Sequence, residues 1–265
     1  MKNLNIGLLV LGTLSLLLIS QCTVKRESKT LKDYYELRIY TLADDIQEER
    51  TDAYLENAFL PALKRNNVEN IGVFKFKPEI QDSIQQIFVL YPIMSPNQLT
   101  QLTEILERDS ILLKDGRQFL KAAHDTPPYE RLEIVQLKAF KDMPFMRPSS
   151  LKGPREKRVY ELRSYESPTE ELYRNKVEMF NEGGEITLFE DLGFNAVFYA
   201  EVIAGSRMPN LMYMTTFKDM ETRDTLWKDF VDSDTWKELS GDPKYQNNVS
   251  RADIHLLYPT TYSDY

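Results

Sequence analysis

The sequence predicts an α+β protein that contains two copies of one strand-and-helix unit. The motif Tyr-Glu-Leu-Arg occurs at residues 35–38 and again, 125 positions later, at residues 160–163. The same shift keeps apolar and polar residues matched well beyond the motif, until the second copy loses five residues before its last strand-like segment. An internal repeat of this kind indicates the architecture, so it is considered before the individual helices and strands. We therefore predict two homologous domains, residues 34–140 and 159–265.

Each copy shows the order strand, helix, strand, strand, helix, strand. In the first copy, alternation at residues 34–42 predicts a strand, and helical periodicity follows at residues 48–66. Pro61 inside that window predicts a kink or break. The remaining elements of the first copy are predicted as strands at residues 72–76, 84–91 and 131–140 and a helical region at residues 96–123. This βαββαβ order is the ferredoxin-like arrangement, an antiparallel sheet with helices on one face. Residues 141–158 lack periodicity and predict a linker.

Length and composition exclude several classes of function. The chain has 265 residues, of which 42% are apolar, so it can bury a core without disulfides or a structural metal. The formal net charge is -8 and no basic stretch is large enough for a phosphate-tracking groove, so we expect no nucleic-acid partner. Two histidines and one cysteine cannot form a zinc or thiolate cluster, and no phosphate loop, dinucleotide fingerprint or nucleophile elbow occurs. We therefore expect no metal and no cofactor.

The N-terminal residues predict export. Lys2 precedes an apolar run of roughly 15 residues, which fits the core of a signal peptide and is short for a membrane span. The run ends at Cys22, the only cysteine, and resembles a bacterial lipoprotein signal, although Gln21 stands where that pattern has a small residue. The resemblance implies a signal peptide at residues 1–21, a lipidated Cys22, and a tether at residues 22–33 that anchors the protein to a membrane of the bacterial cell envelope. The alternative is an uncleaved N-terminal anchor.

The tandem strands and the segments that follow them resemble the NIPSNAP family. The matching segments are "LPALKRNNVENIGVF", "ITLFEDLGFNAVFYAE", "SRMPNLMYMTTF" and "LWKDFVDSDTWKEL". The resemblance extends over residues 34–262 and is closer in the second copy. It implies a dimeric α/β-barrel superfamily fold, in which the antiparallel sheets of the two ferredoxin-like units pair as one barrel within the chain. The superfamily includes small monooxygenases, haem-handling enzymes and muconolactone-isomerase-like proteins, but NIPSNAP proteins have no established catalytic residues.

Strand alternation divides the repeated motif into two faces. Tyr35, Leu37 and Ile39 share one face, which we expect to meet the helices. The opposite face then points toward the lumen of the inferred barrel. The residues expected there are Glu36, Arg38 and Tyr40 of the first copy, Glu161, Arg163 and Tyr165 of the second, and Asp253 and His255 of the last strand. One interpretation is a set of Glu–Arg pairs that hold the barrel together, because buried charges must be paired. The other is a pocket for an anionic or aromatic small molecule, with Arg163 as carboxylate binder and Tyr165 as a wall.

Residues that differ between the copies are further candidates. His255 replaces Val135 of the first copy, and we expect it beside Asp253 and near Arg163, as a general base, a haem ligand or a hydrogen-bonded structural residue. The acidic glycine-containing segment at residues 181–185 predicts a break in the helix, either as a flexible lip over the pocket or as a plain loop. Trp227, Phe230 and Trp236 match apolar residues of the first copy, which predicts core packing.

Two functional hypotheses follow. The first is a non-catalytic envelope protein that binds a small molecule or a protein partner through its barrel domains. The alternative is a cofactor-free monooxygenase-like or isomerase-like enzyme with its site in the barrel lumen, using His255 with Arg163 and Tyr165. An open cavity that these three side chains line would favour the enzyme, and a closed lumen would favour the binding protein. The sequence does not decide between a monomer and a homo-oligomer.

Overall fold

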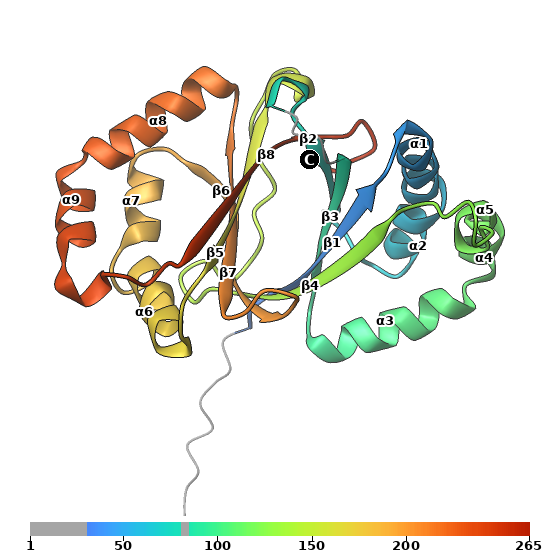
Figure 1. The fold of residues 1–265 in the computed structure, drawn as a ribbon, viewed down its shortest axis with the longest axis horizontal. Helices are drawn as coiled ribbons and strands as arrows, with labels where there is room; N and C mark the ends of the chain where they lie inside the picture. The colour runs from blue at the N-terminus through green and yellow to red at the C-terminus, as the bar shows by residue number, and fades with distance from the viewer. Residues whose placement is uncertain (1–30, 81–84) are drawn as a thin grey trace, which may run out of the picture. The chain divides into compact units, whose positions relative to one another are not determined.

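Eight antiparallel strands close into one barrel that carries helices on its outside (Figure 1). The computed structural model describes residues 31–80 and 85–265, and one compact unit spans Leu31–Tyr265. Around the barrel the strands follow the order β1-β3-β2-β8-β5-β7-β6-β4. Their bounds are β1 (Tyr34–Leu42), β2 (Gly72–Phe76), β3 (Gln85–Ile93), β4 (Arg131–Ala139), β5 (Val159–Glu166), β6 (Asn195–Ala204), β7 (Asn210–Phe217) and β8 (Arg251–Pro259).

The helices form two groups on opposite sides of the barrel, one from each half of the chain (Figure 1). The first group contains α1 (Asp45–Tyr54), the π-helical turn η1 (Leu55–Phe59), α2 (Leu60–Arg65), α3 (Pro96–Arg108), α4 (Ser110–Asp115) and α5 (Arg117–Leu120). The second group contains α6 (Glu170–Phe180), α7 (Glu185–Asp191), α8 (Met220–Asp232) and α9 (Asp234–Gly241). Short 3₁₀ turns lie at η2 (Pro78–Ile80), η3 (Arg155–Lys157) and η4 (Pro243–Tyr245).

The two halves of the chain complete the barrel together. β2 of the first half pairs with β8 of the second, and β4 of the first pairs with β6 of the second. Both halves follow the predicted order of strands and helices. The structure thus confirms that sheets of the two halves close one barrel within the chain. The division of this single unit into two tandem domains stays a prediction from the repeat.

The first helical window differs from the prediction at Pro61. The chain continues from α1 into α2 through the π-helical turn η1, and Pro61 lies in the first turn of α2. Proline cannot donate the usual helical hydrogen bond, and a wider turn before it accommodates the loss without ending the helix. The predicted kink is therefore a local widening of one helical stretch.

The predicted linker at residues 141–158 packs against the barrel. Met143 and Met146 are buried, and Met146 joins the apolar cluster inside the barrel. Arg155 donates through Nη1 to the carbonyl oxygens of Thr260 and Ser263, at 3.2 and 2.8 Å. The connection between the halves is consequently part of the folded unit.

The two faces of the repeated strands lie opposite to the prediction. Tyr35 and Leu37, with Tyr160 and Leu162, are fully buried in the lumen cluster. The same cluster contains Phe74, Phe88, Phe198, Met214 and Leu257. A closed eight-stranded barrel is only wide enough for side chains to fill it, so its interior takes the apolar face. The expected lumen position of both Glu-Arg-Tyr sets is therefore wrong, and these sets lie beneath the helices.

The predicted signal peptide, most of the tether and Cys22 lie outside the described residues. Within residues 31–80 and 85–265, no helix is both long enough and apolar enough to cross a membrane.

The packed lumen predicts a large cost for truncating one of its aromatic side chains. Phe74 is fully buried and its ring lies 4.9 Å from that of Tyr160 and 5.5 Å from that of Tyr265. We expect Phe74→Ala to lower the free energy of unfolding by about 3–5 kcal/mol in urea titrations. Phe145→Ala is the matched control, because Phe145 is 51% exposed and its loss should change stability by less than about 0.5 kcal/mol. Equal effects of the two substitutions would contradict a packed lumen.

Candidate functional site

A cavity of about 600 Å³ lies between the outer face of β5, β7 and β8 and the helices α6, α8 and α9. Its aromatic lining consists of Tyr165, Tyr213, Trp227, Phe230, Trp236 and Tyr245. Its charged lining consists of Arg163, Lys176, Glu185 and Arg223. The volume lies within the range of small-molecule sites, and the combination of an apolar wall with a few charges is typical of such sites.

The first charged group of the cavity is built around Glu161, whose side chain is fully buried behind the lining. Arg163 donates to it through Nε at 2.6 Å, and Arg223 of α8 donates through Nε at 2.8 Å. Trp227 donates to the same carboxylate through Nε1 at 2.9 Å, and its ring stacks on the Arg163 guanidinium, 3.6 Å from carbon to centroid. One strand carboxylate thereby holds two guanidiniums and the tryptophan of a helix in fixed positions. We call Glu161, Arg163 and Arg223 the arginine group.

The charges of the arginine group offset the unfavourable free energy of their burial. Burial alone would raise the pKa of Glu161, but the hydrogen bond from Arg223 and the charge of Arg163 outweigh it, so the pKa lies below its usual value. Burial opposes the charge of Arg163, yet the oxygens of Tyr213, Tyr165 and Glu161 keep its pKa above the ordinary value. Both guanidiniums therefore stay charged, and the group carries a net charge of about +1. Asp224 also pairs with Arg223, but its carboxylate is 63% exposed and is screened by solvent.

The second charged group is the ion pair between Lys176 of α6 and Glu185 of α7. Their Nζ and Oε2 atoms are 2.8 Å apart, and the two side chains are 5% and 3% exposed. Lys176 Nζ also lies 4.7 Å from the ring centroid of Phe180 and 5.8 Å from that of Trp236. A buried ion pair among aromatic rings thus forms part of the cavity wall.

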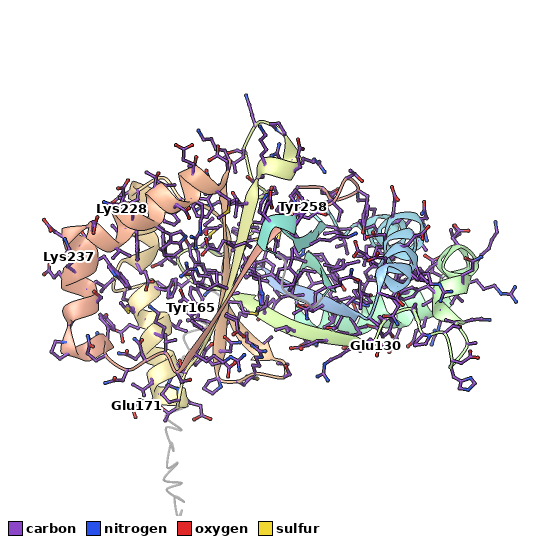
Figure 2. All side chains as sticks on the ribbon, turned by 45° about the horizontal axis from the view of Figure 1, so that its top comes forward. Glu130, Tyr165, Glu171, Lys228, Lys237 and Tyr258 are labelled. Atoms are coloured by element: carbon purple, nitrogen blue, oxygen red, sulfur yellow. The ribbon has the colours of Figure 1, made fainter. Side chains whose placement is uncertain are left out.

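Tyr165 connects the two charged groups. Its hydroxyl accepts from Arg163 Nη1 at 2.8 Å and shares a hydrogen bond with Tyr213 at 2.9 Å, while its ring lies 6.0 Å from Lys176 Nζ. Figure 2 shows Tyr165 between the strands and the helices of the second half. Tyr165 thus lies beside Arg163 in the cavity lining, and its role as a wall for a ligand stays a prediction.

The equivalent position in the first half is filled. Arg38 donates through Nε to Glu36 at 2.5 Å, as Arg163 does to Glu161, and Tyr91 donates its hydroxyl to Glu36. The Phe59 ring of η1 covers the Arg38 guanidinium, at 4.7 Å. Tyr40, also predicted as a site residue, packs in the apolar cluster with Phe59. The same strand motif therefore lies under a phenyl ring in one half and beside a cavity in the other.

The sequence difference behind this contrast lies in residues 181–185. With the repeat shift of 125, Gly184 takes the place of Phe59 and Glu185 that of Leu60. Gly184 has a φ of +87°, a left-handed conformation that favours glycine, and it precedes α7. Here α6 has already ended at Phe180, so no counterpart of the Phe59 ring covers the arginine group, and Trp227 of α8 stacks on Arg163 instead. The segment is an ordered turn that separates α6 from α7 and opens the cavity.

His255 does not belong to this cavity. It pairs in register with Leu162, which points into the barrel, whereas Arg163 points to the helices, so the expected proximity of His255 to Arg163 is wrong. Its ring contacts Phe76 and Phe88 near a small cavity of about 100 Å³, which has room for a few waters and none for a haem. Burial and the charge of Arg207 lower the pKa of His255 to about 4, so it is neutral at pH 7.

Asp253 lies on the same side as His255. It pairs in register with Ser164 and forms an ion pair with Arg207. Of the eight predicted pocket residues, the structure brings Arg163 and Tyr165 to the cavity with Glu161 directly behind them. It separates from them Asp253, His255, Glu36, Arg38 and Tyr40.

A second large hollow of about 680 Å³ lies beside α1 and α5 of the first half. Its charged lining residues Glu49, Arg50 and Asp115 are exposed, and the stacked rings of Tyr54 and Phe119 line its apolar part. We place the candidate site in the second half because only there does the cavity adjoin buried, mutually paired charges. Within the described residues, no group of three or more metal-ligating side chains occurs.

One protein family matches the second half of the chain. Residues 160–264 match the NIPSNAP family. These residues contain β5 apart from its first residue, β6 to β8 and α6 to α9, and therefore the whole cavity lining. The first half, which the sequence resemblance also included, lies outside the matched residues. No curated protein matches the chain.

Solved structures share the barrel. A candidate monooxygenase from Fusobacterium nucleatum is 7% identical, over 86% of this chain and 92% of its own, with a TM-score of 0.57. A candidate monooxygenase from Lactobacillus acidophilus is 8% identical, over 86% and 94%, with a TM-score of 0.52. A NIPSNAP family protein from Agrobacterium tumefaciens is 17% identical over 40% of this chain and 97% of its own, with a TM-score of 0.36. At such identities the first two show a common fold alone.

Sequence reasoning missed four functional candidates: Lys176, Glu185, Arg223 and Trp227. The first two replace Thr51 and Leu60 at the repeat shift of 125, and such changes from uncharged to charged residues were a usable signal. Trp227 and Trp236 were expected to be core residues, and they do pack around the buried Phe230, but both also line the cavity.

The arginine group predicts that neutralising Glu161 destabilises the protein more than neutralising Glu36. Glu161 compensates two guanidiniums, whereas Glu36 compensates one. We expect Glu161→Gln to lower the free energy of unfolding by about 3 kcal/mol, because it removes the buried carboxylate that two partly buried guanidiniums share. Glu36→Gln should cost clearly less. Chemical denaturation of both variants measures this, and an equal or reversed order would contradict the geometry.

The lowered pKa of Glu161 also predicts a pH dependence. Because the carboxyl binds its proton less readily in the folded than in the unfolded chain, its contribution to stability is fully present above the ordinary value of 4.5. That contribution is lost as the pH falls through the lower pKa of the folded state. The stability difference between wild type and Glu161→Gln should therefore shrink below pH 4.5. A difference that stays constant between pH 7 and pH 3 would show that Glu161 is not held as a carboxylate.

Proposed function

We propose that this chain is a NIPSNAP-family binding protein with two tandem copies of the family domain, and that its second copy holds a small molecule in the cavity. The observation that carries the proposal is the contrast between the halves. The same Glu-Arg strand motif is covered by Phe59 in the first half and borders a cavity of about 600 Å³ in the second. A difference confined to one copy of a repeat supports a role beyond holding the barrel together.

The charge of the cavity favours an anionic ligand. Arg163 and Arg223 share one carboxylate, so their group keeps an excess positive charge, while Lys176 and Glu185 neutralise each other. Each guanidinium has five N–H donors, and the protein contacts of Arg163 and Arg223 leave donors free among the described residues. Guanidiniums of this kind bind carboxylates through paired hydrogen bonds.

The aromatic wall favours a ligand with a flat apolar part. The Trp236 and Phe230 rings lie 4.5 Å apart, and Trp227 and Phe230 lie 5.4 Å apart, so one continuous aromatic surface borders the cavity. Aromatic ligands gain offset-stacked or edge contacts on such a surface. Together with the arginine group, this supports an aromatic or similarly planar carboxylic acid as ligand.

The enzyme alternative loses its proposed location. The lumen is packed with apolar side chains, and His255 lies on the opposite face of the sheet from Arg163 and Tyr165. The solved structures described as monooxygenases share the fold at 7–8% identity, which transfers no activity. We therefore propose binding, and any turnover of a bound ligand would have to occur in the cavity under the helices.

Calorimetric titration of the folded chain with cinnamate, a planar carboxylate, tests the proposal. We expect cinnamate to bind and the neutral cinnamamide to bind more weakly by roughly 10- to 100-fold, the worth of a charge-assisted hydrogen bond. Arg163→Gln should lose a similar factor, whereas its repeat partner Arg38→Gln should retain wild-type affinity at comparable thermal stability. Failure of wild type to bind, or equal losses in the two variants, would refute the assignment. Mass spectrometry of the recovered cinnamate would reveal any turnover.

We further propose that the protein is exported and anchored through a lipid on Cys22, since an apolar run ends at this single cysteine. Wild type expressed in bacteria should incorporate labelled palmitate and sediment with membranes, whereas Cys22→Ser should do neither. Equal labelling of both forms would refute lipidation at this residue.

A further inference from the structure

We propose that the ligand of this cavity is a hydroxy acid, whose carboxylate binds the arginine group and whose hydroxyl binds between Lys176 and Glu185. This inference rests on the proposed function and assigns the second charged group of the same cavity. Its starting observation is that Lys176 and Glu185 are buried yet line the cavity.

The first half of the fold forms without an equivalent of this ion pair. Removing two charges from water costs several kcal/mol per ion, and apolar residues often replace a buried pair without loss of stability. The first half of the chain has Thr51 and Leu60 at the matching positions and forms its part of the same barrel. Only the second copy of the repeat has this buried pair. Contact with a ligand therefore explains the pair better than a role in holding the barrel together.

The pair offers a donor and an acceptor side by side. Lys176 Nζ has three N–H bonds and donates to Glu185 Oε2 and to the sulfur of Met179, at 2.8 and 3.3 Å. Among the described residues this leaves one N–H of Lys176 and the Oε1 atom of Glu185 without a hydrogen-bond partner. A hydroxyl both donates and accepts one hydrogen bond readily, so it satisfies both groups at once. A second carboxylate would meet the repulsion of Glu185, and a second ammonium that of Lys176.

The contacts of Tyr165 limit the length of a ligand that reaches both charged groups. The Tyr165 side chain reaches from one to the other, with its hydroxyl 2.8 Å from Arg163 Nη1 and its ring 6.0 Å from Lys176 Nζ. These two contacts set an upper limit on the distance between the charged groups, which is the length of the phenol side chain plus the two contact distances. A ligand whose carboxylate and hydroxyl lie at opposite ends of a single planar ring fits within this limit, along the wall formed by Trp227 and Trp236.

Titration with cinnamate and 4-hydroxycinnamate tests the inference, because the two acids differ only in the distal hydroxyl. We expect wild type to bind 4-hydroxycinnamate at least about tenfold more tightly, since the hydroxyl bonds to charged partners. The double variant Lys176→Met/Glu185→Leu, which replaces the pair by apolar residues of similar size, should lose this preference and bind the two acids with equal affinity. A thermal melt verifies that the variant is folded.

The outcomes separate this inference from the proposed function. Equal binding of both acids to wild type would overturn the hydroxy-acid assignment and leave the binding function intact. No binding of either acid would refute both. A preference for the hydroxylated acid that survives in the double variant would show that other groups bind the hydroxyl. If the double variant does not fold, Glu185→Gln provides the test: it keeps the shape of the side chain, and an unchanged preference in it would overturn the assignment.

Discussion

The interior of the closed barrel must be filled by side chains, and this constraint determines where the charged residues of the strands lie. Tyr35 and Tyr160, the first residues of the two repeated motifs, turn inward with the other large apolar side chains. Because neighbouring residues of a strand point to opposite faces, Glu36 and Glu161 must turn outward, beneath the helices. The cavity of about 600 Å³ lies on the outside of the barrel, whereas apolar side chains fill its inside except for a small cavity of about 100 Å³.

The helices determine whether the outward-facing charges are covered by side chains or border a cavity. In the first half, the helix continues through η1 and places Phe59 over Arg38. In the second half, the turn at Gly184 ends this continuity, and Trp227 of α8 stacks on Arg163. One strand motif thereby supports a filled position and an open one, and the difference comes from a few residues in the helical layer.

Structural and functional interpretations of the Glu-Arg motif are compatible. Glu161 joins strand β5 to helix α8 through Arg223 and Trp227, which is a structural role. Because a single carboxylate serves two guanidiniums, the same contacts leave excess positive charge at the cavity wall. In the first half Glu36 serves one guanidinium, so its pair is balanced and has a structural role only. The number of cations per carboxylate separates the two cases.

The sequence by itself determined the repeat and the order of the elements, because hydrophobic periodicity and the repeat shift are read directly from the chain. The closed barrel was an expectation from the family resemblance, and the structure confirms it. The sequence also singled out Arg163 and Tyr165. It could not determine which strand face enters the barrel, since both faces are buried and alternation shows only that they differ. Nor could it bring Arg223 and Lys176, from separate helices, to Arg163 and Tyr165 of one strand. Those positions depend on how the helices pack on the barrel, and only the tertiary structure decided them.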